Sequence, residues 1–456
     1  MADERAIAVV GSGAAGLGAA FRLQQAGFRV RMFESNGYVG GRMKTIRREG
    51  YLIEEGAALF PSTYKNLLGI TREAGFGGQV IRSEGIFGFP FDGGIDLIDC
   101  DHVITSALRQ RALGPIAKAK MLRLIRDCLR YRKGVLTGDL SRLADADVES
   151  VADYSDRVLS PEILEYVVGP ALRGIAGEEP DRLSVLDLFY TLNLFLGRMR
   201  PLVFRDGVST YAERLTRRWD VELNTRVRTV EEDAAGVSLT IVSPEGTRTD
   251  RFAGCILAIP PTVVCETYPA LDDERTAFLR QTKSTPSVNI NVALRRANPD
   301  LRWANLQVPT SVSPDLLAIV QFHRYGPGRA PQGKGQIGVY SAPELSARLM
   351  NQPDDVCAQE IMRRVDKVCP GLVDDVEFVH VNRWDPILFV SWPGYYKELL
   401  RFQELSAKRD QRIRLAGDYF TVSSMNGATA SGETAARALI RHLSHAPTPG
   451  SERLPA

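Results

Sequence analysis

The sequence predicts an α/β protein in which a parallel sheet is assembled from three separated stretches of chain. Residues 6–34 run in the order strand, glycine turn, helix and strand. Residues 255–261 (CILAIPP) form an apolar strand that two prolines stop, as expected of a buried central strand. Residues 413–439 give a short strand, a polar loop and an amphipathic helix. Strands that alternate with helices are typical of α/β folds.

The glycine turn GSGAAG, which begins at Gly11, has the spacing of a dinucleotide-binding motif. Gly11 permits the tight turn, Gly13 lets the backbone approach a pyrophosphate, and Gly16 lets the helix pack closely on the strand. The helix begins at Ala14 and Ala15 with free N–H groups and a positive dipole end, which favour phosphates. The first unit is therefore predicted to be Rossmann-like.

Polar residues and a second pair of glycines follow the second strand. Glu34 ends this strand, where a carboxylate accepts hydrogen bonds from a ribose diol and disfavours a 2′-phosphate. Gly40 and Gly41 give the backbone a second approach to phosphate, and Arg42 can meet the phosphate with its guanidinium. We expect these residues, together with Ser35, to complete the nucleotide site. The glycine motif alone does not choose between FAD and NAD.

The run from Val9 to Thr45 resembles the opening of the superfamily of flavin amine oxidases, protoporphyrinogen oxidases and phytoene desaturases, and so implies FAD. Residues 147–184 resemble the protoporphyrinogen oxidase branch, with an E-S-V helix and a turn that reads EPDRLS. The resemblance covers nearly all of residues 6–445. It implies an FAD-binding domain of the glutathione-reductase type, discontinuous in sequence, and an α+β substrate domain.

The resemblance adds further cofactor contacts in the middle of the chain. Gly56 and Ala57, in the segment YLIEEGAALF, correspond to backbone that lies near the reactive edge of the flavin. Val227 corresponds to a residue whose backbone touches the adenine; an edge strand without ligand contact is the alternative.

The C-terminal segment supplies a second half of the cofactor site. Asp418, after Gly417, can hydrogen-bond the ribityl chain. The helix N-terminus near Asn426, Gly427 and Ala428 can stabilise negative charge at the pyrimidine edge of a reduced flavin, as the family's equivalent segment does. No cysteine lies in residues 426–431, so we expect FAD to be held non-covalently.

We expect two domains, because 456 residues exceed one ordinary core. The expected FAD-binding domain comprises residues 1–75, 203–268 and 405–445. The expected substrate domain comprises residues 76–202, a helical insert, and residues 269–404, which contain a sheet. Residues 446–456 are predicted to be a disordered tail.

The predicted substrate domain departs from the pattern of flavin amine oxidases, which carry a lysine that holds a water near the flavin. The best counterpart is the strand SVNINVAL (residues 287–294), with Asn289 and Asn291 but no lysine. We expect both asparagines to line the substrate cavity. Trp392 and Tyr395 correspond to aromatic residues before the last cofactor segment, and either wall this cavity or belong to the core. The missing lysine points away from simple amine oxidation.

The catalytic residues are not identified by the resemblance. Protoporphyrinogen oxidases and carotenoid desaturases act on large apolar or amphiphilic substrates and need little beyond flavin geometry for hydride removal. A carbon–carbon desaturation also releases a proton. The candidates to accept it are His102, His323 and Tyr325, with a structural hydrogen-bonding role as the alternative for each.

Composition limits the classes of partner. Lysine and arginine (57) nearly balance aspartate and glutamate (55), which gives no electrostatic case for nucleic acid. The six cysteines are scattered, without metal-ligand spacing, so we expect reduced thiols and no metal site in a cytoplasmic protein. No secretion signal is recognised at the N-terminus, and no stretch reaches the roughly 20 apolar residues of a spanning helix.

Residues 109–133 contain nine lysines and arginines against one acid, with apolar residues interleaved at helical spacing. This segment is a peripheral membrane surface, the basic rim of an entrance for an anionic substrate, or a solvated helix face.

Three functions remain open at this point. The leading hypothesis is an FAD-dependent oxidase or desaturase that takes a hydride from a carbon–hydrogen bond of a sizeable, largely apolar substrate and passes the electrons to oxygen or a quinone. The second is a flavin amine oxidase with an altered site. The third is a flavin-free binding protein on the same fold, as in the prenyl-GTPase escort proteins; Glu34, Gly41 and Asp418 argue against it.

Overall fold

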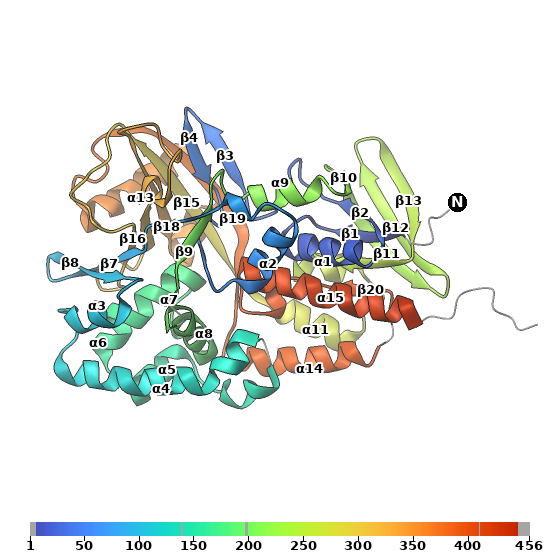
Figure 1. Ribbon diagram of the computed structural model, residues 1–456, viewed down its shortest axis with the longest axis horizontal. Helices are drawn as coiled ribbons and strands as arrows, with labels where there is room; N and C mark the ends of the chain where they lie inside the picture. Colours follow the sequence, from blue (N-terminus) through green and yellow to red (C-terminus); the bar gives the residue numbers. More distant parts are fainter. Residues whose placement is uncertain (1–5, 138–139, 197–198, 410, 446–456) are drawn as a thin grey trace, which may run out of the picture.

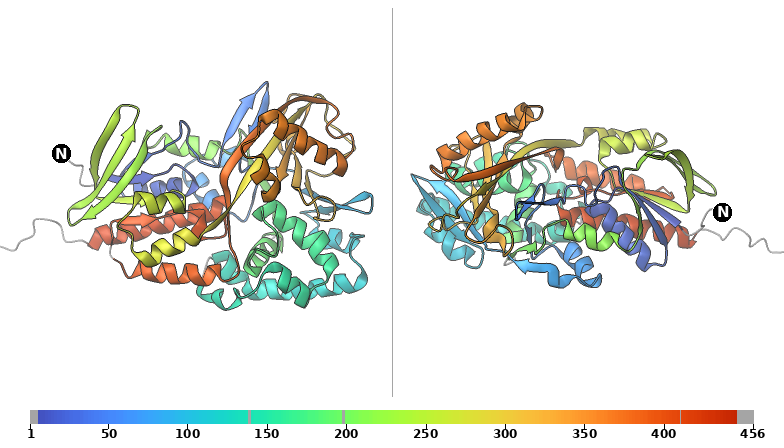
Figure 2. Two further views of the ribbon diagram at one scale, coloured as in Figure 1. Left: turned by 180° about the vertical axis from the view of Figure 1, so that it is seen from behind. Right: turned by 90° about the horizontal axis from the view of Figure 1, so that it is seen from above.

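The structure is a computed structural model that describes residues 6–137, 140–196, 199–409 and 411–445. The tail expected at residues 446–456 lies outside these ranges. Figure 1 shows a parallel sheet with its helices on the right, a larger sheet on the upper left, and a group of helices below the larger sheet. Figure 2 shows the same arrangement from behind and from above.

The parallel sheet has the predicted central strands and draws them from distant parts of the chain. Its order is β10-β2-β1-β14-β20, and every neighbouring pair is parallel. The strands are β1 (Ala6–Val10), β2 (Arg29–Phe33), β10 (Asp220–Glu222), β14 (Gly254–Leu257) and β20 (Ile413–Leu415). The residues of β1 and β14 are all buried, which explains their unbroken apolar sequences.

Helix α1 (Ala14–Gln25) packs directly against helix α15 (Met425–His445), so the two ends of the described chain meet at the cofactor half of the molecule. Glycines make this contact possible. A Cβ added to Gly18 would lie 2.7 Å from the carbonyl oxygen of Thr429, and one added to Gly432 would lie 1.9 Å from that of Ala15. The two backbones therefore touch.

The cofactor half of the molecule also contains a three-stranded antiparallel sheet. It contains β11 (Arg226–Asp233), β12 (Gly236–Ser243) and β13 (Gly246–Phe252). β10 ends at Glu222 and pairs with β2, so residues 221–230 contribute to two strands in different sheets. The polar residues of β13 are largely accessible and give no apolar period, so this strand was not predicted from the sequence.

The larger sheet has seven strands in the order β19-β15-β18-β17-β16-β7-β8. They are β7 (Ile86–Phe91), β8 (Gly94–Asp99), β15 (Lys283–Leu294), β16 (Asn305–Gln307), β17 (Leu316–Gln321), β18 (Gly335–Ser341) and β19 (Val376–Val390). β15 pairs with β18 on one side and with β19, a strand not predicted from the sequence, on the other. β17 pairs with β18.

The two faces of this sheet differ in chemistry. One face buries Val288, Ile290 and Val292 of β15 under α12 (Pro343–Leu349) and α13 (Asp354–Val368). The opposite face carries buried amides, because alternate residues of a strand point to opposite sides. These amides are Asn289, Asn291, Asn305, Gln307, Gln336 and Asn382.

Strand β4 (Tyr51–Glu54) crosses the amide face and is held by it. The Gln336 side chain donates to the carbonyl oxygen of Leu52 at 3.0 Å, and Asn291 donates to that of Glu54 at 3.2 Å. The amides satisfy carbonyl groups that the hairpin of β3 (Thr45–Arg48) and β4 leaves unpaired. They fix the position of the chain that leads to Gly56.

Helices of the insert lie below the larger sheet (Figure 1). They are α3 (Val103–Arg109), α4 (Pro115–Thr137), α5 (Val151–Val158), α6 (Pro161–Ile163), α7 (Gly169–Ala176) and α8 (Val185–Leu196). Arg173 of α7 is fully buried and donates to the carbonyl oxygens of Val308 at 2.6 Å and Pro314 at 2.8 Å. It ties the insert to the sheet.

The remaining helices and short strands connect the two sheets. They are β5 (Phe60–Pro61), α2 (Lys65–Glu73), β6 (Val80–Arg82), β9 (Pro201–Phe204), α9 (Thr210–Thr216), α10 (Pro261–Thr267), α11 (Asp273–Gln281) and α14 (Tyr395–Ala407). In the part of the chain described here, no helix combines the length and hydropathy needed to cross a membrane.

Candidate cofactor and active site

Ser12, the residue between the first two glycines, joins three parts of the predicted nucleotide site. Its backbone N–H and hydroxyl donate to the Glu34 carboxylate at 2.9 and 2.6 Å. Its hydroxyl oxygen also accepts a hydrogen bond from the Gly40 N–H at 3.1 Å. Ser12 and Glu34 are 0% and 5% exposed, so this junction is a fixed part of the fold. The glycine motif alone does not predict this role for Ser12.

The glycines of the two loops lie against one another, and Gly13 borders open space. No heavy atom lies within 4 Å of a Cβ added to Gly13, whereas one added to Gly41 would lie 3.5 Å from the Gly13 Cα. Gly11 and Gly41 have φ of +95° and +56°, which side chains rarely tolerate. Helix α1 has no side-chain cap at its N-terminus. Its first N–H groups are therefore free for an anion.

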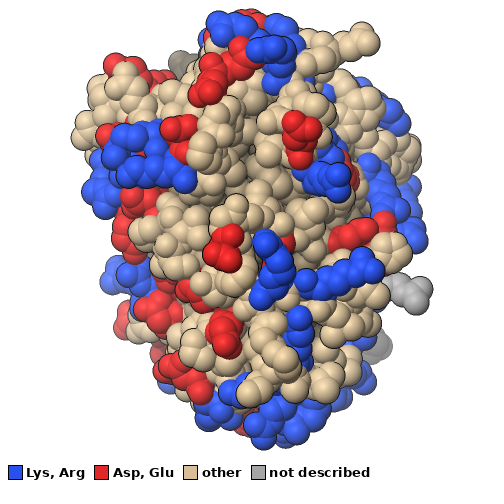
Figure 3. Space-filling view, turned by 90° about the vertical axis from the view of Figure 1, so that its left-hand side faces the viewer, with Lys and Arg blue, Asp and Glu red and all other residues tan. Residues whose placement is uncertain are grey.

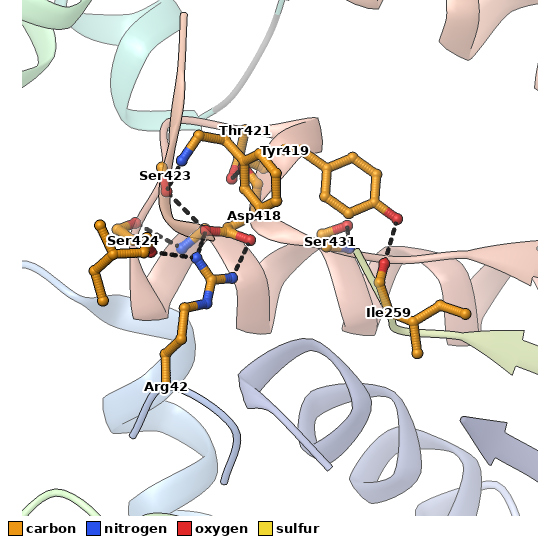
Figure 4. A network of polar contacts seen from close by, with 12 residues as sticks. Arg42, Ile259, Asp418, Tyr419, Thr421, Ser423, Ser424 and Ser431 are labelled. Carbon is orange, nitrogen blue, oxygen red and sulfur yellow. Dashed lines mark hydrogen bonds and ion pairs between the residues drawn. The ribbon is translucent and has the colours of Figure 1, made fainter. Parts of the chain in front are cut away.

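Asp418 and Arg42 form a bidentate ion pair in the second half of the site (Figure 4). The Arg42 guanidinium donates to the two carboxylate oxygens at 2.9 and 2.6 Å, and Ser423 donates to one of them at 2.7 Å. Arg42 also donates to the carbonyl oxygen of Ile387, at the end of β19, at 2.7 Å. The pair joins the phosphate loop, the last cofactor segment and the larger sheet at one point.

Hydrogen bonds also fix the chain on both sides of Asp418. The N–H of Gly417 donates to the hydroxyl of Ser431 at 3.1 Å, and the Tyr419 hydroxyl donates to the carbonyl oxygen of Ile259 at 3.0 Å (Figure 4).

Gly56 lies directly beside the Arg42 backbone. A Cβ added to Gly56 would lie 2.0 Å from the Arg42 carbonyl oxygen, and the Ala57 N–H donates to the same oxygen at 3.2 Å. The carbonyl oxygen before Gly56, that of Glu55, accepts hydrogen bonds from Asn382 at 2.6 Å and Trp384 at 2.7 Å. Both phosphate loop and sheet therefore hold this backbone segment.

The N-terminus of α15 lies next to that of α2. The Asn426 side chain accepts hydrogen bonds from the N–H groups of Asn66 at 2.9 Å and Leu67 at 3.3 Å, and so caps α2. The Asn426 side chain is occupied by this cap, which leaves its backbone for a ligand. A Cβ added to Gly427 would lie 2.2 Å from the Thr421 hydroxyl, and Ala428 is buried behind it.

Val227 lies near the other end of the site. The chain just before it runs beside the Glu34 segment, since the Thr225 N–H donates to the Glu34 carbonyl oxygen at 2.8 Å. Val227 is 5% exposed, and a register shift follows it in β11. Ser35 follows Glu34, and its hydroxyl is 3.5 Å from the Glu34 carboxylate.

A charged cluster beside Gly56 was not predicted. The Glu55 carboxylate is 2.8 Å from the Nε2 atom of His380 and 2.6 Å from the ammonium of Lys44. Burial raises the pKa of Glu55, but the hydrogen bonds from His380 and Lys44 outweigh it, so the pKa is lowered. His380 is 325 positions from Glu55, and no local pattern links the two residues.

Glu54 forms a fully buried ion pair. Arg329 donates to its carboxylate at 2.7 Å, and the Val208 N–H and the Thr45 hydroxyl donate to it as well. Burial raises the pKa of Glu54 against the lowering effect of Arg329. Both carboxylates, Glu54 and Glu55, are buried between segments of the chain.

The three proton-acceptor candidates do not lie together. His102 is exposed at the start of α3. The Nδ1 atom of His323 lies 3.1 Å from both the backbone nitrogen and the carbonyl oxygen of Gln336, and burial lowers the pKa of the imidazole. Tyr325 is buried, its hydroxyl contacts Asn305, and burial raises its pKa well above the usual value.

The residues predicted to line the substrate cavity lie in two different parts of the structure. Asn289 and Asn291 lie on the amide face, where Asn289 accepts from the Ser341 N–H at 3.1 Å. Trp392 and Tyr395 instead pack in the core near Phe278, with Tyr395 2% exposed. The enclosed ring of Tyr395 supports the core alternative for this residue, whereas Trp392 is only partly buried against the same core.

The structure extends β15 to Lys283, a residue that the predicted strand did not include. Lys283 is exposed, and its ammonium lies 5.6 Å from the centre of the Trp392 ring. Asn289 is six residues further on, about 20 Å along the strand. Lys283 therefore lies far from the part of β15 that holds β4.

Within the ranges that the structure covers, no three His, Cys, Asp or Glu side chains group as metal ligands. All six cysteines are free thiols, and five of them are buried.

Comparisons with known proteins agree with this geometry. Residues 14–440 match the family described as flavin containing amine oxidoreductase. Coproporphyrinogen III oxidase of Staphylococcus aureus is 21% identical over 486 aligned positions, which cover 96% of this chain and 100% of that enzyme. Mitochondrial protoporphyrinogen oxidase of Nicotiana tabacum is 27% identical over 189 residues, 39% of this chain but only 34% of the tobacco protein.

The fold is shared with solved structures. Cyclohexylamine oxidase from Brevibacterium oxydans superposes with a TM-score of 0.73 at 17% identity, covering 96% of this chain and 99% of that one. These findings confirm the predicted α/β FAD-binding fold and the flavin cofactor. The chain belongs to the flavin containing amine oxidoreductase family.

Proposed function

We propose that this chain is an FAD-dependent oxidase or desaturase that takes a hydride from a carbon–hydrogen bond of a sizeable, largely apolar substrate. A porphyrinogen, a polyene or another biosynthetic intermediate fits this class. The electrons then pass to oxygen or a quinone.

The chemistry of the amide face carries the proposal. The four central strands β15, β16, β17 and β18 contain no charged residue beyond the exposed Lys283. Burying an ammonium or a carboxylate against such a face is costly without an ionic partner. These four strands offer no carboxylate to hold the ammonium of a charged amine, which favours hydride removal from the carbon of a largely uncharged substrate.

Several residues would hold the cofactor in this proposal. Gly13 and Gly41 would admit the pyrophosphate, Glu34 would accept hydrogen bonds from the ribose, and Asp418 would hydrogen-bond the ribityl chain. The first N–H groups of α15 would stabilise negative charge at the pyrimidine edge. When bound, FAD supplies a two-electron acceptor for the hydride.

His323 is the proton acceptor that the protonation states favour. Its lowered pKa leaves a neutral imidazole near neutral pH, which can take a proton. Tyr325 remains protonated because burial raises its pKa well above the usual value. His323→Gln is therefore expected to lower turnover while FAD content stays unchanged.

We place the protein in the cytoplasm, with a peripheral membrane contact through residues 109–133. The free, mostly buried thiols support a reducing compartment. The basic segment supports the membrane contact.

Anaerobic mixing tests the reaction. The yellow holoprotein is mixed with a porphyrinogen, a polyene and a set of small primary amines, and flavin absorbance is followed. Bleaching by an apolar substrate, with slow or no bleaching by amines, is the expected result.

Two other outcomes would overturn the proposal. Rapid bleaching by a simple amine, with peroxide released in air, would identify an amine oxidase with an altered site. A purified protein that stays colourless after incubation with FAD would identify a binding protein on this fold.

A further inference from the structure

One face of the edge strand β19 holds Glu55, the residue before Gly56. The Nε2 atom of His380 lies 2.8 Å from the Glu55 carboxylate. The side chains of Asn382 and Trp384 donate to the Glu55 carbonyl oxygen at 2.6 and 2.7 Å. Alternate residues of a strand point to the same side, so these three contacts come from one face of β19. The larger sheet therefore fixes both the side chain and the backbone of Glu55.

Lys44 holds the same carboxylate from the cofactor half of the molecule. Its ammonium lies 2.6 Å from the Oε2 atom of Glu55, whereas His380 contacts the Oε1 atom. The ammonium also lies 4.8 Å from the centre of the Tyr38 ring, where a cation is favoured. The Glu55 carboxylate thus bridges the larger sheet and the loop that follows Gly41.

This ion pair is shielded from solvent on one side. Charged side chains of both signs are spread over the surface of the larger sheet and the insert (Figure 3), where water and salt screen them. The Glu55 side chain is only 9% exposed, and that of Lys44 is 31% exposed. The lowered pKa of Glu55 keeps its carboxylate ionised. The pair therefore holds one negative and one positive charge that largely cancel.

We propose that Lys44 and Glu55 set the reduction potential of the bound flavin through the balance of their charges. Reduction by a hydride adds two electrons and one proton, and therefore one negative charge, to the flavin. The Lys44 ammonium stabilises this charge and the Glu55 carboxylate opposes it. The proposal rests on the proposed function for the position of the flavin edge beside Gly56, but not for the identity of the substrate.

His380 is a positioning residue in this arrangement, because it acts on the flavin only through Glu55. Together with Asn382 and Trp384, it keeps the Glu55 carboxylate in reach of Lys44 and keeps the chain at Gly56 in place. The sheet that carries the amide face therefore also fixes the charges that act on the cofactor.

Reductive titration of the holoprotein against a redox dye, at low salt, measures the potential without a substrate. Glu55→Gln leaves the Lys44 ammonium uncompensated, so the equilibrium constant for two-electron reduction is expected to rise roughly tenfold, or about 30 mV. Lys44→Met leaves the carboxylate uncompensated and is expected to lower the constant by a similar factor. Lys44→Met/Glu55→Gln is expected to return it close to the wild-type value.

The ion pair of Lys334 and Glu377 gives a matched control on the same sheet. Its charged groups are 2.6 Å apart, and its side chains are partly exposed. Glu377 also accepts a hydrogen bond from the Tyr51 hydroxyl at 2.7 Å. Tyr51 is five residues before Gly56, which is about 16 Å of extended chain. Lys334→Met and Glu377→Gln are expected to change the constant by less than about twofold.

Unchanged potentials in both Glu55→Gln and Lys44→Met would overturn the proposal, as would shifts of the same sign. Equal shifts in the control pair would also overturn it. The two single variants test opposite signs, so loss of FAD from one leaves the other decisive. Loss of FAD from both would identify a purely structural cluster and would overturn the proposal too.

The titration also separates this proposal from the proposed function. A chain whose potentials shift as expected, but whose flavin no apolar substrate bleaches, refutes the proposed function alone. A chain whose flavin an apolar substrate bleaches, but whose potentials do not shift, refutes the charge balance alone.

Discussion

Substitution of Gly13 is expected to weaken FAD binding without destabilising the fold, because the protein leaves room for a side chain at this position. Its φ of −68° and ψ of 178° suit any residue, and no heavy atom lies within 4 Å of an added Cβ. Gly13→Ala is therefore expected to change the free energy of unfolding of the FAD-free protein by less than about 1 kcal/mol, and to raise it, because alanine lowers the entropy of the unfolded chain.

The same Cβ occupies space that the pyrophosphate needs. A crowding cost of about 1–3 kcal/mol corresponds to a Kd for FAD that is weaker by about 5- to 150-fold. Gly13→Val adds two methyl groups and is expected to abolish the yellow absorbance. FAD titration of the stripped protein gives the Kd, and urea unfolding gives the stability.

Gly16→Ala is the matched comparison. Its Cβ would lie 1.9 Å from the Gly11 carbonyl oxygen, so the damage falls on the fold with or without FAD. Full yellow absorbance in Gly13→Val would refute the phosphate placement. A stability loss in FAD-free Gly13→Ala as large as that in Gly16→Ala would refute the claim of open space.

Three further predictions concern buried carboxylates. Glu34→Ala is expected to weaken FAD by about 1–3 kcal/mol, and an unchanged Kd in calorimetry would remove Glu34 from the site. Arg329→Met leaves the Glu54 carboxyl buried without its cation, and we expect it to lower the free energy of unfolding in urea by about 3–5 kcal/mol. The double variant Arg329→Met/Glu54→Gln is expected to recover part of this loss. Wild-type stability in the single variant would contradict the prediction. Burial raises the pKa of Asp187 from 3.8 to about 7, so the folded state binds this proton more tightly and stability is lost as pH rises between these values. The Tm advantage of Asp187→Asn over the wild type should therefore grow across that interval, and a constant difference would count against it.

Motifs with a local mechanical cause could be read from the sequence. The turn at Gly11, the open position at Gly13 and the close helix packing at Gly16 each follow from a backbone requirement within a few residues. Glu34 could be placed for the same reason, since the end of β2 lies beside the turn. The family match over residues 14–440 confirms the fold that these features predicted.

Contacts between distant segments could not be read in this way. Arg42 and Asp418 are 376 positions apart, and each was assigned to FAD without any indication that they pair. The order of the strands could not be predicted either. β17 has the apolar pattern of a buried strand, but this pattern does not indicate which strand pairs with it. β19 was missed because charged and polar residues and Pro386 interrupt its alternation.

Aromatic residues gave the least reliable prediction of position. Tyr395 lies in the chain close to the last cofactor segment, but its ring turns into the core beside Phe278. Sequence distance from a site does not give the direction of a side chain at the start of a helix.

The backbone contact between α1 and α15 has a consequence for synthesis of the protein. A nascent chain that has not yet reached β20 has made the glycine turn but lacks Asp418 and the helix against which Gly18 packs. We therefore expect FAD to be taken up after translation, by a finished polypeptide. Any early stop that removes α15 should yield a colourless product whose α1 surface, shaped for close backbone contact, is left open to proteases.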